Sequence, residues 1–130
     1  MTYLYTAILT PSADGNKVYA RVPDVAGCAT SGRSVADAID QITDALSGCL
    51  VVAEDEGLPI AAPTPQTELE HDAGDICTLI RVDTIAYRAA TDDRAVRKNV
   101  SIPAWMANLA DKRGINCSKV LQDALRQQLA

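Results

Sequence analysis

The chain has 130 residues, of which 48% are hydrophobic and 22% charged, and its formal net charge at pH 7 is −5. This is the composition of a folded globular protein. No apolar run approaches the roughly 20 residues that a membrane-spanning helix needs, and the N-terminal stretch lacks the basic region and cleavage site of a signal peptide. We therefore expect a soluble cytoplasmic protein of one or two small domains.

Three short strands are predicted at the start of the chain. Apolar and polar residues alternate over Tyr3–Thr10, and residues 11–16 supply Pro, Ser, Asp, Gly and Asn for a turn. A second strand is predicted over Lys17–Val22 and a short third strand over Cys28–Ser31. The order and the short connections predict an antiparallel meander.

The strongest helix signal begins at Ser34. Ser34 and Asp37 have the spacing of a capping box, and apolar residues then recur every three or four positions for about 20 residues. This periodicity predicts a helix that packs on one face of the sheet. The apolar stripe consists of Val35, Ala38, Ile39, Ile42, Ala45, Leu46, Cys49, Leu50 and Ala53, and Asp37, Asp40, Asp44 and Ser47 fall on the other side.

The middle of the chain is less regular. Three prolines in Leu58–Pro65 exclude a helix there, and Gln66–His71 is predicted to form a short helical turn. Ile76–Asp83 is rich in β-formers and is predicted as a strand, with an extension to Tyr87 left open. Residues 1–88 would then form an α+β domain, an antiparallel sheet packed by a long helix. The polar residues 89–95 are predicted to be a linker.

Residues 96–130 have the order strand, helix, turn, helix. Val96–Ile102 alternates, with Arg97, Asn99 and Ser101 on the face opposite Val100 and Ile102. Pro103 suits the start of a helix, and Asn116 follows Gly114 at the start of a second helix. So short a unit buries too little apolar surface to fold alone, which predicts a dimer. Its core would consist of Trp105, Leu109, Val120, Leu121, Ala124, Leu125 and Leu129.

Charge divides the chain into two parts. Residues 1–90 carry five basic and 13 acidic side chains, a net charge of −8, whereas residues 94–130 carry seven basic and two acidic ones, a net charge of +5. An acidic body joined to a basic end indicates two partners of different kinds. The four cysteines form no CxxC pair, and there is a single histidine. We expect reduced thiols, no metal and no cofactor.

The C-terminal pattern resembles the ribbon-helix-helix family of DNA-binding domains. That resemblance implies that two copies pair their strands as a ribbon in the major groove. Arg97 would then bond guanine, Asn99 adenine and Ser101 either a base or a phosphate. At the second helix, the backbone N–H groups of Asn116, Cys117 and Ser118 would face a phosphate, and the side chains of Ser118 and Lys119 would add contacts. By alternation Lys98 falls on the inward face of the strand, from which it would have to extend to solvent or to a backbone phosphate, so its role is left open.

The N-terminal half is similar to the HicB family of antitoxins. The similarity rests on Pro23-Asp24, Val25, Gly27-Cys28, Thr30, Gly32 and Ala36-Asp37-Ala38, with Asp37 where the family often has Glu. It implies a partially degraded ribonuclease H fold, followed in many members by a DNA-binding module.

The implied function is that of an antitoxin in a type II toxin–antitoxin system. The protein would neutralise a HicA-type mRNA interferase by direct binding and repress its own operon by binding operator DNA. A dimer of dimers would bind two DNA sites at once. Two alternatives are a repressor whose N-terminal domain senses a small ligand and a metal-dependent ribonuclease. No catalytic residue is predicted, because the first strand lacks the carboxylates that two-metal hydrolysis needs.

Overall fold

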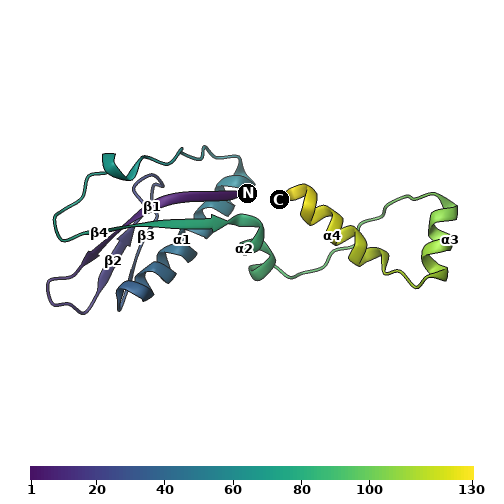
Figure 1. Ribbon diagram of the computed structural model, residues 1–130, viewed down its shortest axis with the longest axis horizontal. Helices are drawn as coiled ribbons and strands as arrows, with labels where there is room; N and C mark the ends of the chain where they lie inside the picture. Colours follow the sequence, from purple (N-terminus) through teal and green to yellow (C-terminus); the bar gives the residue numbers. More distant parts are fainter.

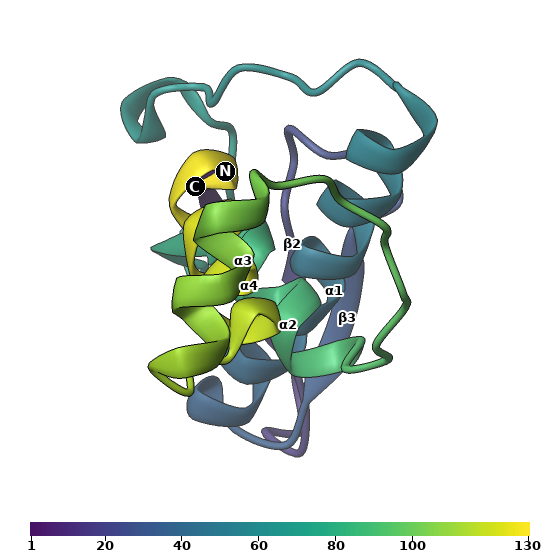
Figure 2. The ribbon, with the colours of Figure 1, turned by 90° about the vertical axis from the view of Figure 1, so that its right-hand side faces the viewer.

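The computed structural model describes residues 1–130 and shows a body and a separate C-terminal part (Figure 1). The body contains a sheet and two helices. Residues 92–103 have no regular secondary structure and lead to two further helices, which lie beyond one end of the body (Figures 1 and 2). No helix combines the length and the apolar character that crossing a membrane would require.

Four antiparallel strands form the sheet, in the order β3-β2-β1-β4. The first three are β1 (Thr2–Pro11), β2 (Val18–Arg21) and β3 (Ala29–Gly32), which confirms the predicted meander. Strand β4 (Ile76–Asp83) pairs with β1 along nearly its whole length, from Thr2 opposite Asp83 to Leu9 opposite Ile76. The strand predicted over residues 76–83 is therefore confirmed as an edge of the same sheet.

Helix α1 (Val35–Glu56) lies across one face of this sheet (Figure 1). Ser34 begins it, since its side chain accepts a hydrogen bond from the Asp37 backbone N–H at 3.1 Å. The Asp37 carboxylate in turn accepts a hydrogen bond from the Arg33 N–H at 2.8 Å. The predicted capping box therefore forms, except that this carboxylate bonds the N–H of Arg33 instead of that of the N-cap residue Ser34. Gly57 ends the helix in the left-handed conformation, with φ of 66°.

The core lies between α1 and the sheet. Ala38, Ile42, Leu46 and Leu50 recur every four residues and are all buried, which confirms the centre of the predicted apolar stripe. Ser47, expected on the outer side, is buried instead. Its hydroxyl donates to the Thr43 carbonyl at 2.7 Å, which satisfies the polar group within the helix. The sheet contributes Tyr5, Ala7, Leu9, Val18, Ala20, Val22, Ile80 and Val82 to the core, and the loop before β3 contributes Cys28.

Strand β4 does not extend to Tyr87, a question that the sequence left open, because a helix begins directly after Asp83. Helix α2 (Thr84–Thr91) starts where the Asp83 carboxylate accepts hydrogen bonds from the backbone N–H groups of Ile85 and Ala86. This cap outweighs the β preference of the Thr-Ile-Ala-Tyr sequence. The helix also takes up residues 89–91 of the predicted linker. Gln66–Glu68 forms a single 3-10 turn within the predicted short helical segment.

The two helices expected near the C-terminus are present, as α3 (Ala104–Lys112) and α4 (Cys117–Leu129). Gly114, with φ of 63°, reverses the chain between them. The strand expected over residues 96–102 does not form in the single chain. The physical reason is that a strand needs a neighbouring strand for its backbone hydrogen bonds, and no strand of this chain pairs with residues 96–102.

We predict that Gly32→Ala destabilises the body. A Cβ at Gly32 would lie 2.7 Å from the Cα of Ala38, so β3 and α1 would have to move apart, at a cost of about 1–3 kcal/mol. Urea unfolding followed by circular dichroism measures the change. Gly74→Ala is the matched control, because its Cβ would meet no atom within 4 Å. Equal stability of the two variants would contradict this account of α1 packing.

Candidate functional site

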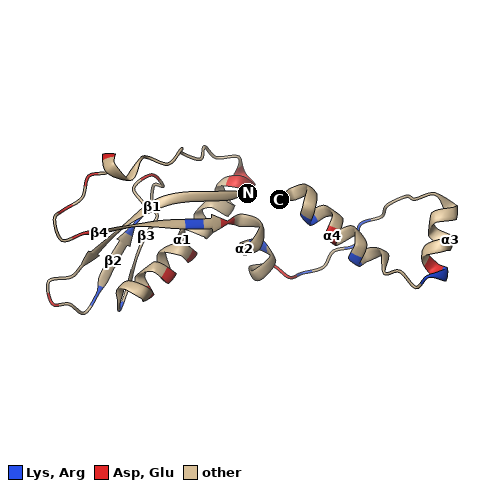
Figure 3. Cartoon of the chain, in the orientation of Figure 1, with Lys and Arg blue, Asp and Glu red and all other residues tan.

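The exposed side of α1 is strongly acidic. The helix carries Asp37, Asp40, Asp44, Glu54, Asp55 and Glu56 but no Lys or Arg. Figure 3 shows these acidic positions at intervals along the helix. Acidic residues in the last turn face the negative end of the helix dipole, which is an unfavourable place for them unless a cation lies nearby. The acidic last turn, Glu54 to Glu56, would therefore be stabilised by a nearby cation.

An apolar groove runs along the flank of α1. It has a volume of about 730 Å³, and 11 of its 15 lining residues are hydrophobic. One wall is α1 itself from Asp44 to Ala53, the second includes Val25 and Ala26 of the turn between β2 and β3, and the third is Leu58–Ala61. Tyr87 of α2 also lines the groove. Sequence patterns did not predict this groove, because its walls come from four separate segments.

Hydrogen bonds hold the loop wall of the groove in place. The Asp24 carboxylate accepts from the backbone N–H of Thr64 at 2.8 Å and from its hydroxyl at 2.6 Å. The Tyr5 hydroxyl donates to the carbonyl of Ala61. Burial, followed by the charge of Asp24, raises the pKa of Tyr5, so this phenol stays protonated as a donor. The segment after α1 is thus anchored to both the β2–β3 turn and the sheet.

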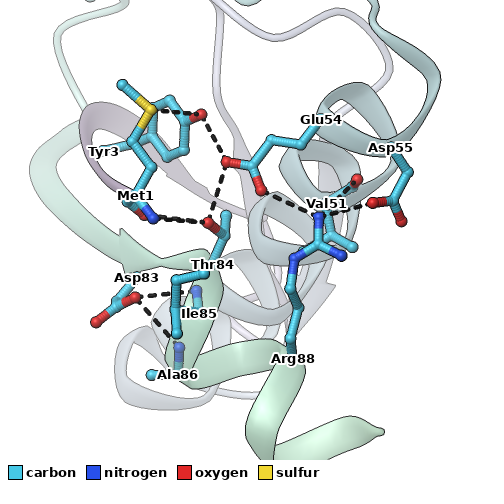
Figure 4. Close-up of polar contacts among 10 residues, drawn as sticks. All are labelled: Met1, Tyr3, Val51, Glu54, Asp55, Asp83, Thr84, Ile85, Ala86 and Arg88. Carbon is cyan, nitrogen blue, oxygen red and sulfur yellow. Dashed lines mark hydrogen bonds and ion pairs between the residues drawn. The ribbon is translucent and has the colours of Figure 1, made fainter. Parts of the chain in front are cut away.

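A polar cluster joins the C-terminal end of α1 to β1 and α2 (Figure 4). The Glu54 carboxylate accepts hydrogen bonds from the Tyr3 hydroxyl at 2.8 Å and from the fully buried Thr84 hydroxyl at 3.1 Å. Arg88 of α2 pairs with Glu54 at 3.1 Å and with Asp55 at 2.8 Å. Arg88 is the cation that offsets the acidic helix end, and it fixes α2 against α1.

The protonation of this cluster follows from its contacts. Burial alone would raise the pKa of Glu54, but hydrogen bonds from Tyr3, Arg88 and Thr84 outweigh it and lower that pKa below its ordinary value. Burial and the bond to Glu54 raise the pKa of Tyr3 to about 12. The hydrogen bonds that Arg88 donates to Asp55 and Glu54 raise the pKa of Arg88. Glu54 is therefore ionised and Tyr3 neutral near pH 7.

The residues predicted to contact DNA lie in two separate places. Arg97, Asn99 and Ser101 are exposed on the extended segment before α3. Asn116, Cys117, Ser118 and Lys119 are exposed at the start of α4. The Asn116 side chain accepts from the Lys119 N–H at 3.1 Å, which confirms the predicted cap. No hydrogen bond or ion pair joins the two groups within the single chain.

The C-terminal part exposes most of its apolar side chains. Neither α3 nor α4 has a buried residue, although the amphipathic pattern of α4 predicts a covered face. The two helices make no extensive contact with the sheet or with α1. So many exposed large apolar side chains in one part of the chain indicate an interaction surface. The exposed residues are Val96, Val100, Ile102, Trp105, Met106, Leu109, Ile115, Val120, Leu125 and Leu129.

The thiols and the single imidazole do not form a candidate metal site. Cys28, Cys49, Cys77 and Cys117 are all free, and no group of three or more His, Cys, Asp or Glu side chains is placed to hold a metal ion. His71 lies in an exposed loop, where its Nδ1 is 3.1 Å from the carbonyl of Asp72.

Comparison with known proteins identifies the family. The model of the HicB-like antitoxin of bacterial toxin–antitoxin systems matches residues 5–124. This chain belongs to that family. The match includes the acidic body, the linker and most of the two C-terminal helices. No curated protein matches the chain in sequence.

Solved structures share the fold, and two of the three described below do so over nearly the whole chain. A chain of a toxin–antitoxin complex from Streptococcus pneumoniae is 20% identical with a TM-score of 0.61, covering 98% of this chain and 99% of that one. The antitoxin HicB of Burkholderia pseudomallei is 24% identical with a TM-score of 0.56, again covering 98% and 99%. A chain from a HicA3 and HicB3 toxin–antitoxin complex is 20% identical with a TM-score of 0.51, covering 62% of this chain and 99% of that chain.

We predict that Glu54→Gln lowers stability at pH 7 by about 1–2 kcal/mol, since it removes a charged hydrogen-bond acceptor from three donors. Because the folded pKa of Glu54 is lowered, its contribution is present above the ordinary value of 4.5 and is lost as the pH falls through the folded pKa. The difference in unfolding free energy between variant and wild type should therefore decrease to zero as the pH falls below about 4.5. Urea unfolding at several pH values measures it, with the exposed Glu56→Gln as control. A gap independent of pH would contradict the assignment.

Proposed function

We propose that this HicB-like antitoxin neutralises a HicA-type mRNA interferase by direct binding through its acidic body, and that it represses its own operon through a dimeric C-terminal part. The observation that carries the proposal is the charge division. In Figure 3 acidic residues are coloured along α1 and in the loops of the body, whereas beyond α2 the basic residues outnumber the acidic ones. The two parts are thereby suited to a basic and an acidic partner, respectively.

Toxin binding is supported by the chemistry that an mRNA interferase requires. A protein that holds RNA neutralises phosphates with Lys and Arg, so its RNA-binding surface is basic. An acidic helix without a single cation offers complementary charge to that surface. Covering the surface would exclude RNA without any chemical step in the antitoxin.

DNA binding is supported by the uncovered apolar faces of the C-terminal part. A second copy would cover Trp105, Leu109 and Leu125 and would supply the neighbouring strand that residues 96–102 lack. Pairing of two such strands would present Arg97, Asn99 and Ser101 twice on one surface of the ribbon. The N-terminus of α4 in each copy would face a phosphate through the free N–H groups of its first turn. Two such dimers, joined as a tetramer, would bind two half-sites.

The groove on α1 favours one alternative, a repressor whose body senses a small ligand. Its volume lies in the range of small-molecule sites. A ligand that shifts the DNA affinity of the purified protein, in the absence of any toxic neighbour, would favour this alternative.

We predict that the product of the adjacent small reading frame arrests growth when expressed alone, and that co-expression with this chain restores growth. Charge complementarity and a covered active surface should make the two proteins co-purify as a stable complex. Affinity purification of the tagged antitoxin, followed by mass analysis, detects the partner. A neighbour that is harmless alone, or that fails to co-purify, would exclude the antitoxin mechanism for this pair.

We predict that Arg97→Ala weakens operator binding by about 1–3 kcal/mol, which is the contribution of one good base contact. Fluorescence anisotropy with the DNA upstream of the gene, at a fixed salt concentration, measures the affinity. Arg21→Ala is the matched control, because it removes the same charge from an exposed position on the sheet. If Arg97→Ala binds as tightly as the control, Arg97 is not a DNA contact.

A further inference from the structure

Helix α1 has a wider apolar face than the sheet covers. Ala38, Ile42, Leu46 and Leu50 point into the core. The adjacent row of Ala45, Cys49, Val52 and Ala53 lines the groove instead, and Val52 is 50% exposed. A helix that needed only to cover the sheet would carry polar residues in this row. The second apolar row therefore indicates a second contact.

The shape of the groove suits a segment of polypeptide. Its helical wall extends from Asp44 to Ala53, which is ~14 Å at 1.5 Å per residue. Two to three turns of a partner helix have this length. The groove offers few polar groups to orient a small ligand, because both oxygens of Asp24 already accept hydrogen bonds from Thr64. Since these bonds also anchor the loop wall, binding would require little reorganisation.

Charge around the groove selects a basic partner. Asp44 stands on its edge, and Asp40 lies one turn earlier on the same helix. Glu54 and Asp55 follow the far end of the helical wall. Arg88, the only Arg or Lys side chain that forms an ion pair with these residues, is already paired with both of them.

We propose that this groove is the docking site for a basic amphipathic segment of the toxin. Apolar side chains of that segment fill the row around Cys49 and Val52, and its Lys or Arg side chains lie beside Asp40 and Asp44. This inference rests on the proposed function, because it assumes that the body binds a HicA-type toxin, and it assigns the surface of contact.

The test compares the full-length antitoxin with its Val52→Arg variant. The toxin is the product of the adjacent reading frame, made by cell-free synthesis, and the affinity is measured by biolayer interferometry. Arg at position 52 places a bulky cation in the groove, so the toxin should bind at least about tenfold more weakly. Leu79→Arg is the matched control, because Leu79 is 57% exposed on the face of the sheet opposite α1, and its affinity should change less than about twofold.

A second variant keeps the apolar wall intact. Asp40→Asn with Asp44→Asn should slow association and reduce its dependence on salt. Glu68→Gln with Glu70→Gln removes the same charge from an exposed loop outside the groove and should have a smaller effect. Thermal unfolding by circular dichroism verifies that each variant is folded.

The outcomes separate the two proposals. If wild-type antitoxin does not bind the toxin, both the proposed function and the docking site are wrong. If wild type binds, and neither the Val52→Arg nor the Asp40/Asp44 variant differs from its control, the docking site alone is wrong. Weaker binding by the groove variants, with unchanged controls, supports it.

Discussion

The close approach of α1 to the sheet is the constraint on which the rest of the body depends. Gly32 has no side chain, and the backbone of Ala38 occupies the space where a Cβ would stand. This contact fixes the rotation of α1 about its axis and therefore decides which residues face the core. Once Ala38, Ile42, Leu46 and Leu50 are buried, the neighbouring apolar row must face the groove and the aspartates must face solvent.

The far end of α1 is positioned by electrostatics rather than by packing alone. Three consecutive acidic residues at a helix C-terminus are unfavourable, but Arg88 pairs with two of them and Tyr3 and Thr84 donate to Glu54. This cluster connects α1 to β1 and to α2. Because α2 leads directly into residues 92–103, the same contacts determine where the C-terminal part leaves the body (Figures 1 and 4).

Local patterns predicted most of the fold. Period-two alternation located the strands, and the cap at Ser34 located α1. Helix α2 was missed because Thr84, Ile85 and Tyr87 favour strands, whereas the Asp83 cap acts through two backbone bonds. The groove depends on residues from four segments, and no local pattern contains that information. The contact between α1 and Arg88 could have been anticipated, because three acidic residues at the end of a helix indicate that a cation lies nearby. The strand predicted over residues 96–102 does not form in the single chain, and only the proposed dimer would supply the hydrogen-bonding partner that it needs.

The two parts of the proposed function meet at α2. Tyr87 lines the groove, and the next residue, Arg88, holds α2 against the acidic end of α1. A partner that fills the groove therefore touches the helix from which the C-terminal part extends. A basic partner at this site would also compete with Arg88 for Glu54 and Asp55. If a partner does occupy the groove as proposed, its contact with Tyr87 and the pairing of Arg88 with α1 would share one turn of helix, so that the two contacts would be energetically coupled.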